Sequence, residues 1–372
     1  MTDQRDGHES EGFAKPPFLT ERGFKLFRSR LQPWLVLAGL SVALWLGGRI
    51  GWPAIRANIA LIGQRFFLLV ILYLFAQLAF MGGWWVLIGS RARRIGYWRM
   101  FGVYLAGDSV NYFLPPANLT GEPIKAHLLS RSVGFSRSVP SIMVHKHAEI
   151  CAQVVFLCGG LGIAVTQFAL PTELRVLTLA LVLGMGITVA ATFWVLKRGA
   201  FGASLRWLVK RGIPLQHAKS QWQATASLDR WLALFYKTRM PVFYCATFLC
   251  LLGWCGGLLE TYLVLQWLSA EPSLATAVAV ETLAMALNSL IFFIPGRVGS
   301  AETVRVAVFS ALGLPAAQGA VYSIVRRGRE VVWAMPGLFI LLSMKAGLGR
   351  LPSPHYSRMG LTLSPEAVSS PL

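Results

Sequence analysis

Six apolar stretches, each about long enough to cross a bilayer, constrain the fold of this chain most strongly. A membrane-spanning helix needs roughly 20 mainly apolar residues. Hydrophobic residues make up 55% of the 372 residues and charged residues only 14%, which is typical of a membrane protein. We predict an all-α, polytopic helical bundle with about six full spans. The predicted spans are residues 34–50, 66–89, 138–166, 174–196, 241–267 and 319–344.

Two further stretches, at about 98–131 and 275–314, begin as apolar helices but are interrupted by proline. The interruptions are Pro115-Pro116 and Pro295-Gly296, and a short amphipathic helix follows each of them. Proline removes a backbone donor, and glycine permits a sharp reversal of the chain. Unpaired backbone at membrane depth must be surrounded by protein or a water-filled cavity. Each stretch is therefore predicted to be a broken, re-entrant helical hairpin that enters and leaves the membrane on one side.

A set of polar residues occurs twice, once in each predicted hairpin. The first copy contains Asn111, Thr120, Glu122 and Lys125, and the second contains Asn288, Ser300, Glu302 and Arg305. In both, a proline lies seven residues before the glutamate, a hydroxyl residue two before it and a basic residue three after it. The long helices that follow carry two secondary charged pairs, Lys146 with Glu149 and Arg327 with Glu330. Ionisable groups at membrane depth are costly and indicate a functional site, and their duplication predicts a transporter-like site between two halves.

The spacing of these residues suggests how they bind a ligand. Thr120 and Ser300 are predicted helix N-caps, and a half-helix N-terminus favours an anion such as a lipid phosphate. A basic residue one turn later, Lys125 or Arg305, completes the phosphate contact. The glutamates either pair with these bases, take up a proton or bind a headgroup amine, and we favour a phosphate-plus-proton role. Plain helix initiation and internal salt bridges are the alternative interpretations.

The distribution of basic residues predicts an orientation. The formal net charge is +19, and the basic loops fall on one side if both termini are cytoplasmic. Arg49, Arg56 and Arg65 are exceptions, since they flank an external loop. With this orientation the two hairpins open to opposite sides, so the repeats are inverted.

The chain is predicted to have three parts: a head (1–33), a membrane domain (34–344) and a tail (345–372). The membrane domain contains the two repeats, at 66–166 and 241–344, and a basic amphipathic linker at 197–240.

Several function classes are excluded by the same sequence. The basic residues cluster between apolar segments, which favours contact with anionic lipid headgroups and excludes nucleic acid as a partner. The five cysteines lie inside apolar helices and have no metal-site spacing. His145 and His147 point to nearly opposite faces of one helix, so they do not share a metal. We expect no metal, no cofactor and no catalytic residue.

The duplicated residues resemble those of a known family, the transmembrane, flippase-like region of lysylphosphatidylglycerol synthases and of many stand-alone bacterial and archaeal proteins. The resemblance covers about residues 35–345. It is carried by Asn111, Pro116, Gly121-Glu122, Lys125, Gly134, Lys146, Glu149, Pro295-Gly296, Gly299, Glu302, Leu312-Gly313 and Arg327. Thr120-Gly121 and Ser300-Ala301 stand where a double glycine is more usual. The resemblance implies lipid translocation without aminoacyl transfer. One subgroup of the family is associated with hopanoid biosynthesis loci, and the chain is similar to that subgroup.

Three functions follow from these observations. The leading one is secondary, non-ATP-driven translocation of a lipid or lipid-linked substrate across the bacterial inner membrane, with an anionic headgroup as the recognised part. The second is a membrane-embedded enzyme that modifies a lipid headgroup, with Glu122 or Glu302 as general base near His127 or His145. The third is an accessory subunit that binds lipid-biosynthesis enzymes.

Overall fold

The computed structural model describes residues 52–90, 95–113, 120–198, 203, 218–268, 272–291 and 299–346. The predicted head 1–33, the span 34–50, the tail from 347 onward and the prolines of both interruptions lie outside the described residues. Throughout the described part the chain is helical and contains no strand, which confirms the all-α prediction.

The first half of the described chain contains six helices and one 3-10 turn. They are α3 (Trp52–Ile62), the turn η2 (Gly63–Arg65), α4 (Phe66–Ile88), α6 (Tyr97–Phe113), α7 (Glu122–Val133), α8 (Phe135–Gln167) and α9 (Thr172–Arg198). The second half contains α11 (Ala218–Thr238), α12 (Met240–Leu268), α13 (Leu274–Asn288), the turn η3 (Ser289–Ile291), α14 (Ser300–Ala311) and α15 (Ala316–Ala346).

Four helical stretches of the described chain are long and apolar enough to cross a membrane. They are Ile59–Ile88, Arg137–Gln167, Thr172–Arg198 and Met240–Leu268, which confirms four of the predicted spans. The predicted span 319–344 lies within α15, a helix of 31 residues. α15 is long enough to cross, but Arg326, Arg327, Arg329 and Glu330 interrupt its apolar character. Their charges must therefore be satisfied inside the bundle.

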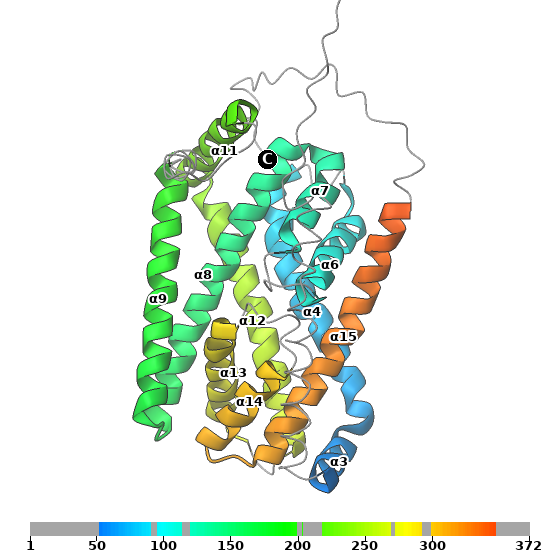
Figure 1. The fold of residues 1–372 in the computed structure, drawn as a ribbon, viewed down its shortest axis with the longest axis vertical. Helices are drawn as coiled ribbons and strands as arrows, with labels where there is room; N and C mark the ends of the chain where they lie inside the picture. The colour runs from blue at the N-terminus through cyan, green and yellow to red at the C-terminus, as the bar shows by residue number, and fades with distance from the viewer. Residues whose placement is uncertain are drawn as a thin grey trace, which may run out of the picture.

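Each of the two interrupted stretches forms a pair of short helices. α6 packs against α7, and α13 packs against α14. The second members, α7 and α14, have 12 residues each and are too short to cross a bilayer. In Figure 1 the α6–α7 pair lies towards the upper end of the bundle, the end at which α11 also lies, and the α13–α14 pair lies towards the lower end. The described helices are compatible with hairpins, while the re-entrant path between them stays a prediction.

Contacts between the halves follow a reciprocal pattern. α6 packs on α15 of the second half, α13 packs on α8 of the first, and α4 lies along α12. Glycine makes both reciprocal contacts close. A Cβ on Gly337 of α15 would collide with Leu105 and Ser109 of α6, and one on Gly160 of α8 would collide with Thr282 of α13. The absence of a side chain at these positions therefore sets how closely the hairpin helices approach the long helices.

A glycine also connects each short helix to the long helix after it. Gly134 joins α7 to α8 with φ 78°, and Gly313 lies between α14 and α15 with φ 75°. Only glycine adopts this left-handed region without a steric penalty. Both chain reversals therefore depend on a glycine, which explains why Gly134 and Leu312-Gly313 stand out in the sequence.

The basic segment 197–240 contains the helix α11, as its amphipathic pattern predicts. α11 packs on α9 and α8, with Leu232, Phe235 and Tyr236 buried. It lies across the same end of the bundle as α7 (Figure 1). The described helix of the basic linker therefore lies near one end of the bundle, against α8 and α9.

We expect Gly337→Ala to lower the free energy of unfolding by about 1–3 kcal/mol, because the added methyl group overpacks the contact between α15 and α6. The measurement is thermal unfolding of the purified protein in detergent. Gly186→Ala is the matched control, since nothing lies within 4 Å of a Cβ at this position on α9. Equal stability of the two variants would contradict the close α6–α15 contact.

Candidate functional site

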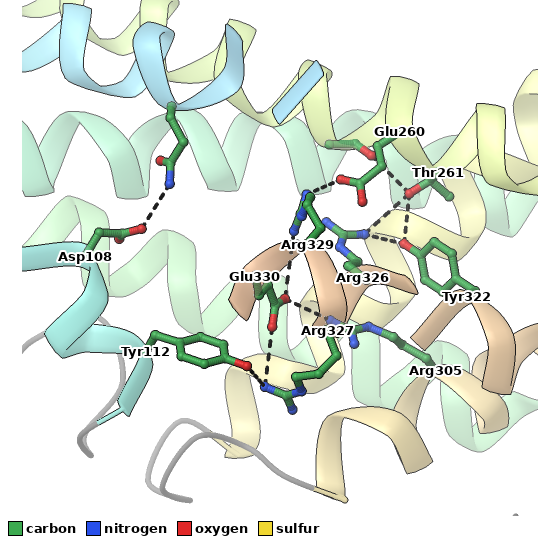
Figure 2. Close-up of polar contacts among 12 residues, drawn as sticks. Asp108, Tyr112, Glu260, Thr261, Arg305, Tyr322, Arg326, Arg327, Arg329 and Glu330 are labelled. Atoms are coloured by element: carbon green, nitrogen blue, oxygen red, sulfur yellow. Dashed lines mark hydrogen bonds and ion pairs between the residues drawn. The ribbon is translucent and has the colours of Figure 1, made fainter. Parts of the chain in front are cut away.

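Four arginines and four glutamates from α12, α13, α14 and α15 gather around the middle of α15. We call this group the arginine–glutamate cluster; most of it is drawn in Figure 2. Its members are Arg305, Arg326, Arg327, Arg329, Glu260, Glu281, Glu302 and Glu330. Their formal charges sum to zero. The cluster contains all the charged residues that the second copy of the repeated motif contributes.

Two arginines of α15 form buried ion pairs with neighbouring helices. Arg326 Nη2 donates to Glu281 Oε1 of α13 at 2.7 Å, and Arg326 also contacts the Tyr322 hydroxyl. Arg329 pairs with Glu260 of α12, and these two side chains are only 3% and 2% exposed. These pairs attach α15 to α12 and α13.

Arg327 lies at the junction of three helices. Its Nε donates to Glu302 Oε1 of α14 at 2.9 Å, and its Nη1 lies 3.4 Å from Glu330 Oε2 on α15. The same Nη1 donates to the Tyr112 hydroxyl at the end of α6 at 3.1 Å (Figure 2). Tyr112 follows Asn111, a candidate residue of the first copy. A side chain of the second half therefore contacts the first hairpin directly.

In the second copy, the acid and base that lie three residues apart on α14 do not bind each other. Glu302 pairs with Arg327, whereas Arg305 Nη2 lies 3.6 Å from Glu330 Oε1. Both contacts join α14 to α15. The predicted pair of Arg327 with Glu330 also forms, at 3.4 Å. With these partners on α15, one polar atom of each of the two α14 side chains has no hydrogen-bond partner.

All four candidate residues of the second copy carry a buried polar atom without a hydrogen-bond partner. These atoms are Asn288 Oδ1, Ser300 Oγ, Glu302 Oε2 and Arg305 Nη1. Buried polar groups in proteins are nearly always hydrogen-bonded. The residues that the sequence singles out therefore retain hydrogen-bonding capacity that a polar ligand can use.

In the first copy, the candidate residues mainly bind one another. Lys125 Nζ lies 3.0 Å from Glu122 Oε1, and the Lys125 ammonium lies 4.6 Å from the centre of the Tyr104 ring. Asn111 donates to Glu122 at 3.3 Å and accepts from the Gly121 amide at 2.6 Å. Among these side chains, Glu122 Oε2 is a buried atom without a partner.

The secondary charged pair of the first half forms within α8. Lys146 Nζ lies 3.0 Å from Glu149 Oε2, and these side chains are 17% and 21% exposed, so the pair is largely removed from the surface. The prediction that Lys146 and Glu149 share one helix face is confirmed, as it is for Arg327 and Glu330.

The two secondary pairs nevertheless differ in their surroundings. Glu330 also contacts Arg305 of α14, whereas the ion pair of Glu149 stays within its own helix and is not part of the arginine–glutamate cluster. The correspondence between Glu149 and Glu330 in the sequence is therefore not matched by equivalent ion pairs among the described residues. The difference arises because α15 brings the second pair against the charged face of α14.

The prediction that Thr120 and Ser300 are helix N-caps is wrong. The N-cap residues are Gly121 for α7 and Gly299 for α14, and neither position has a capping side-chain hydrogen bond. Gly299 has φ 78°, a conformation that favours glycine over serine. Ser300 is instead the first residue of α14. Both glutamates still lie in the first turn of their helices, as predicted.

Several polar partners were not identified from the sequence. Tyr112 has no counterpart in the motif of the second copy, and its closeness to Asn111 is the signal that was available. Asp108 accepts from Gln77 of α4 at 3.1 Å. The histidines of α8 have separate contacts, His145 with the Phe80 carbonyl at 2.9 Å and His147 with the Tyr236 hydroxyl at 2.7 Å.

We expect Arg329→Met to destabilise the protein by about 3–5 kcal/mol, because it leaves Glu260 buried without its counter-charge. The double variant Glu260→Met with Arg329→Met removes both charges and is expected to recover most of this loss. Unfolding of each purified variant in detergent measures the effect. A double variant no more stable than Arg329→Met alone would contradict a mutual pairing.

Comparison with known proteins identifies the family of the chain. The family model described as the lysylphosphatidylglycerol synthase TM region matches residues 34–337, which is most of the chain. No curated protein and no solved structure matches the chain significantly. The match includes both copies of the repeated motif and the four helical stretches that can cross a membrane. The chain is therefore a multi-pass membrane protein that belongs to the lysylphosphatidylglycerol synthase transmembrane-region family.

Proposed function

We propose that the protein is a secondary, non-ATP-driven translocator of a lipid or a lipid-linked substrate. The headgroup passes between the two hairpins while the apolar tail stays in the surrounding lipid. Membership of a family named after a phospholipid-synthesising enzyme supports a lipid as the substrate. We place the protein in the bacterial inner membrane with both termini in the cytoplasm, as the distribution of basic residues favours.

One observation carries this proposal most directly. The four second-copy candidates, Asn288, Ser300, Glu302 and Arg305, keep unpaired polar atoms in the interior of a membrane protein. Each unsatisfied buried group costs free energy, and here four such groups belong to one copy of the repeated motif. A polar ligand that enters the bundle gains the hydrogen bonds that the protein leaves unmade.

The arrangement of the hairpins supports alternating access. The α6–α7 and α13–α14 pairs lie towards opposite ends of the bundle, and each packs on the long helix of the other half (Figure 1). We propose that they are re-entrant hairpins of an inverted internal repeat. Inverted repeats with broken helices are a recurring build of secondary transporters, whose substrate sites lie between the repeats.

The ion pairs suggest how a proton takes part. Glu122 holds the Lys125 ammonium at 3.0 Å, so protonation of Glu122 releases a cation that can bind a phosphate oxygen. In the second copy, Glu302 holds Arg327, and its protonation releases that guanidinium in the same way. We propose that both glutamates are proton-coupled gates and that Lys125 and Arg305 are phosphate contacts. The enzyme alternative gains no support, because the observed partners of both glutamates are basic or amide side chains.

We expect Glu122→Gln and Glu302→Gln each to slow translocation at least tenfold, because glutamine can neither take up the proton nor release it. The measurement is the flipping of a fluorescent phospholipid in proteoliposomes that contain the purified protein. Glu173→Gln is the matched control, since Glu173 is exposed in the first turn of α9 and should keep the wild-type rate. Gel filtration of each purified variant tests whether it is folded. Wild-type rates in both hairpin variants would contradict the assignment.

A further inference from the structure

Resting on the proposed function, we further propose the chemical class of the headgroup that the second copy recognises. We infer that Arg305, Glu302 and Asn288 form a site for a zwitterionic phospholipid headgroup, one that carries a phosphate and a primary ammonium and has no net charge. The phosphate faces Arg305 Nη1, and the ammonium faces Glu302 Oε2 and Asn288 Oδ1. Three of the four unpaired atoms and the charge balance of the arginine–glutamate cluster carry this inference.

To satisfy the unpaired atoms, one ligand must supply both hydrogen-bond acceptors and hydrogen-bond donors. Arg305 Nη1 can only donate, whereas Glu302 Oε2 and Asn288 Oδ1 can only accept. A phosphodiester supplies acceptors alone and leaves the two oxygens unsatisfied. A primary ammonium supplies three donors. A headgroup with both groups, separated by a short carbon spacer, satisfies all three protein atoms.

The positions of these residues bring the two charges within reach of one headgroup. Glu302 and Arg305 lie three residues apart on α14, so they share one face of the helix. Both also bind neighbouring residues of α15, through Arg327 and Glu330. Arg305 is only 7% exposed, so its free Nη1 points into the bundle and not into solvent. Asn288 ends α13, which packs against α14.

The charge balance of the cluster then selects the net charge of the ligand. Four arginines and four glutamates leave the described cluster neutral before any ligand binds. An anionic lipid would leave one negative charge uncompensated in the bundle, unless a proton accompanied it. A zwitterionic headgroup adds no net charge and supplies a counter-charge to both Arg305 and Glu302. Uncompensated charge is costly in a buried site, so the neutral ligand is favoured.

The first copy does not have the same set of free hydrogen-bonding atoms. There the acid and base three residues apart bind each other, and Asn111 is bonded to both Glu122 and the Gly121 amide. The cation and the amide oxygen that the second copy leaves with a free atom are thus engaged in the first, where Glu122 Oε2 is the remaining carboxylate oxygen without a partner. The two copies are therefore unequal in this structure, and the second is the one open to a ligand.

Equilibrium binding to the full-length protein in detergent tests the inference, with three short-chain probes. They are dioctanoyl phosphatidylethanolamine, its N-acetyl derivative, which keeps the phosphate but loses the ammonium, and dioctanoyl phosphatidylglycerol. We expect the first to bind at least tenfold more tightly than the other two by calorimetry. Equal affinity for either anionic probe would overturn the inference in favour of phosphate binding with a proton. Failure of all three probes to bind would also overturn it.

Variants then locate the preference. Glu302→Gln gives the cluster one excess positive charge, so we expect the order of affinities to reverse in favour of phosphatidylglycerol. Asn288→Ala breaks no ion pair and provides a second test if Glu302→Gln fails to fold. It should weaken phosphatidylethanolamine severalfold and leave phosphatidylglycerol unchanged, whereas Glu173→Gln should change neither. An unchanged ratio in both site variants would overturn the assignment of these residues.

The binding measurement separates this inference from the proposed function. A preference for phosphatidylethanolamine without translocation of any lipid would support the inference and contradict only the transport proposal. Translocation of ethanolamine and glycerol lipids at equal rates, with equal affinities, would support transport and overturn only the inference.

Discussion

Pairing of buried charges on α15 is the constraint on which the rest of the bundle depends. A charged residue at the centre of a membrane helix costs about 2.5–3.5 kcal/mol on insertion scales, and α15 carries four such residues close together. Their partners come from α12, α13 and α14, and Tyr112 of α6 adds a hydroxyl. The position of α15 is therefore fixed by ion pairs to three helices and not by apolar packing alone.

The ion pairs of the cluster fall into two groups by their geometry. Arg326 and Arg329 bind acids of α13 and α12 at short range, and these pairs hold the second half together. Arg305 and Arg327 bind acids of α14 and α15 at longer or shared contacts, next to atoms that have no partner. The proposed headgroup site thus uses residues of the same network that holds the helices together. The contact of Arg327 with Tyr112 connects the first hairpin to that network.

Much of this arrangement is predictable from the sequence because it depends on local spacing. Apolar length identifies the spans that the structure confirms, and proline identifies the interruptions between α6 and α7 and between α13 and α14. A spacing of three residues predicts that Lys146 pairs with Glu149 on one helix face, and this pair forms. The first-turn position of Glu122 and Glu302 is likewise local.

The remaining features depend on how helices cross, which spacing along the chain does not encode. Arg305 is one turn from Glu302, yet it binds Glu330, because α15 brings closer partners to both residues. The N-cap prediction fails at Thr120 and Ser300 because Gly121 and Gly299 take the cap positions. Tyr112 adjoins Asn111 of the motif, but the motif does not indicate its contact with Arg327, which joins residues 215 positions apart in the chain.

The central claim is that the two hairpins enter the membrane from opposite sides, and sided cysteine labelling tests it most directly. Ser132, at the end of α7, and Ser310, in the last turn of α14, are both exposed and suit single-cysteine variants in a background without the five native cysteines. The measurement is reaction with a membrane-impermeant maleimide in right-side-out and inverted vesicles. The account predicts that Ser132→Cys reacts only from the cytoplasmic face and Ser310→Cys only from the other face. Reaction of both from the same face would contradict it.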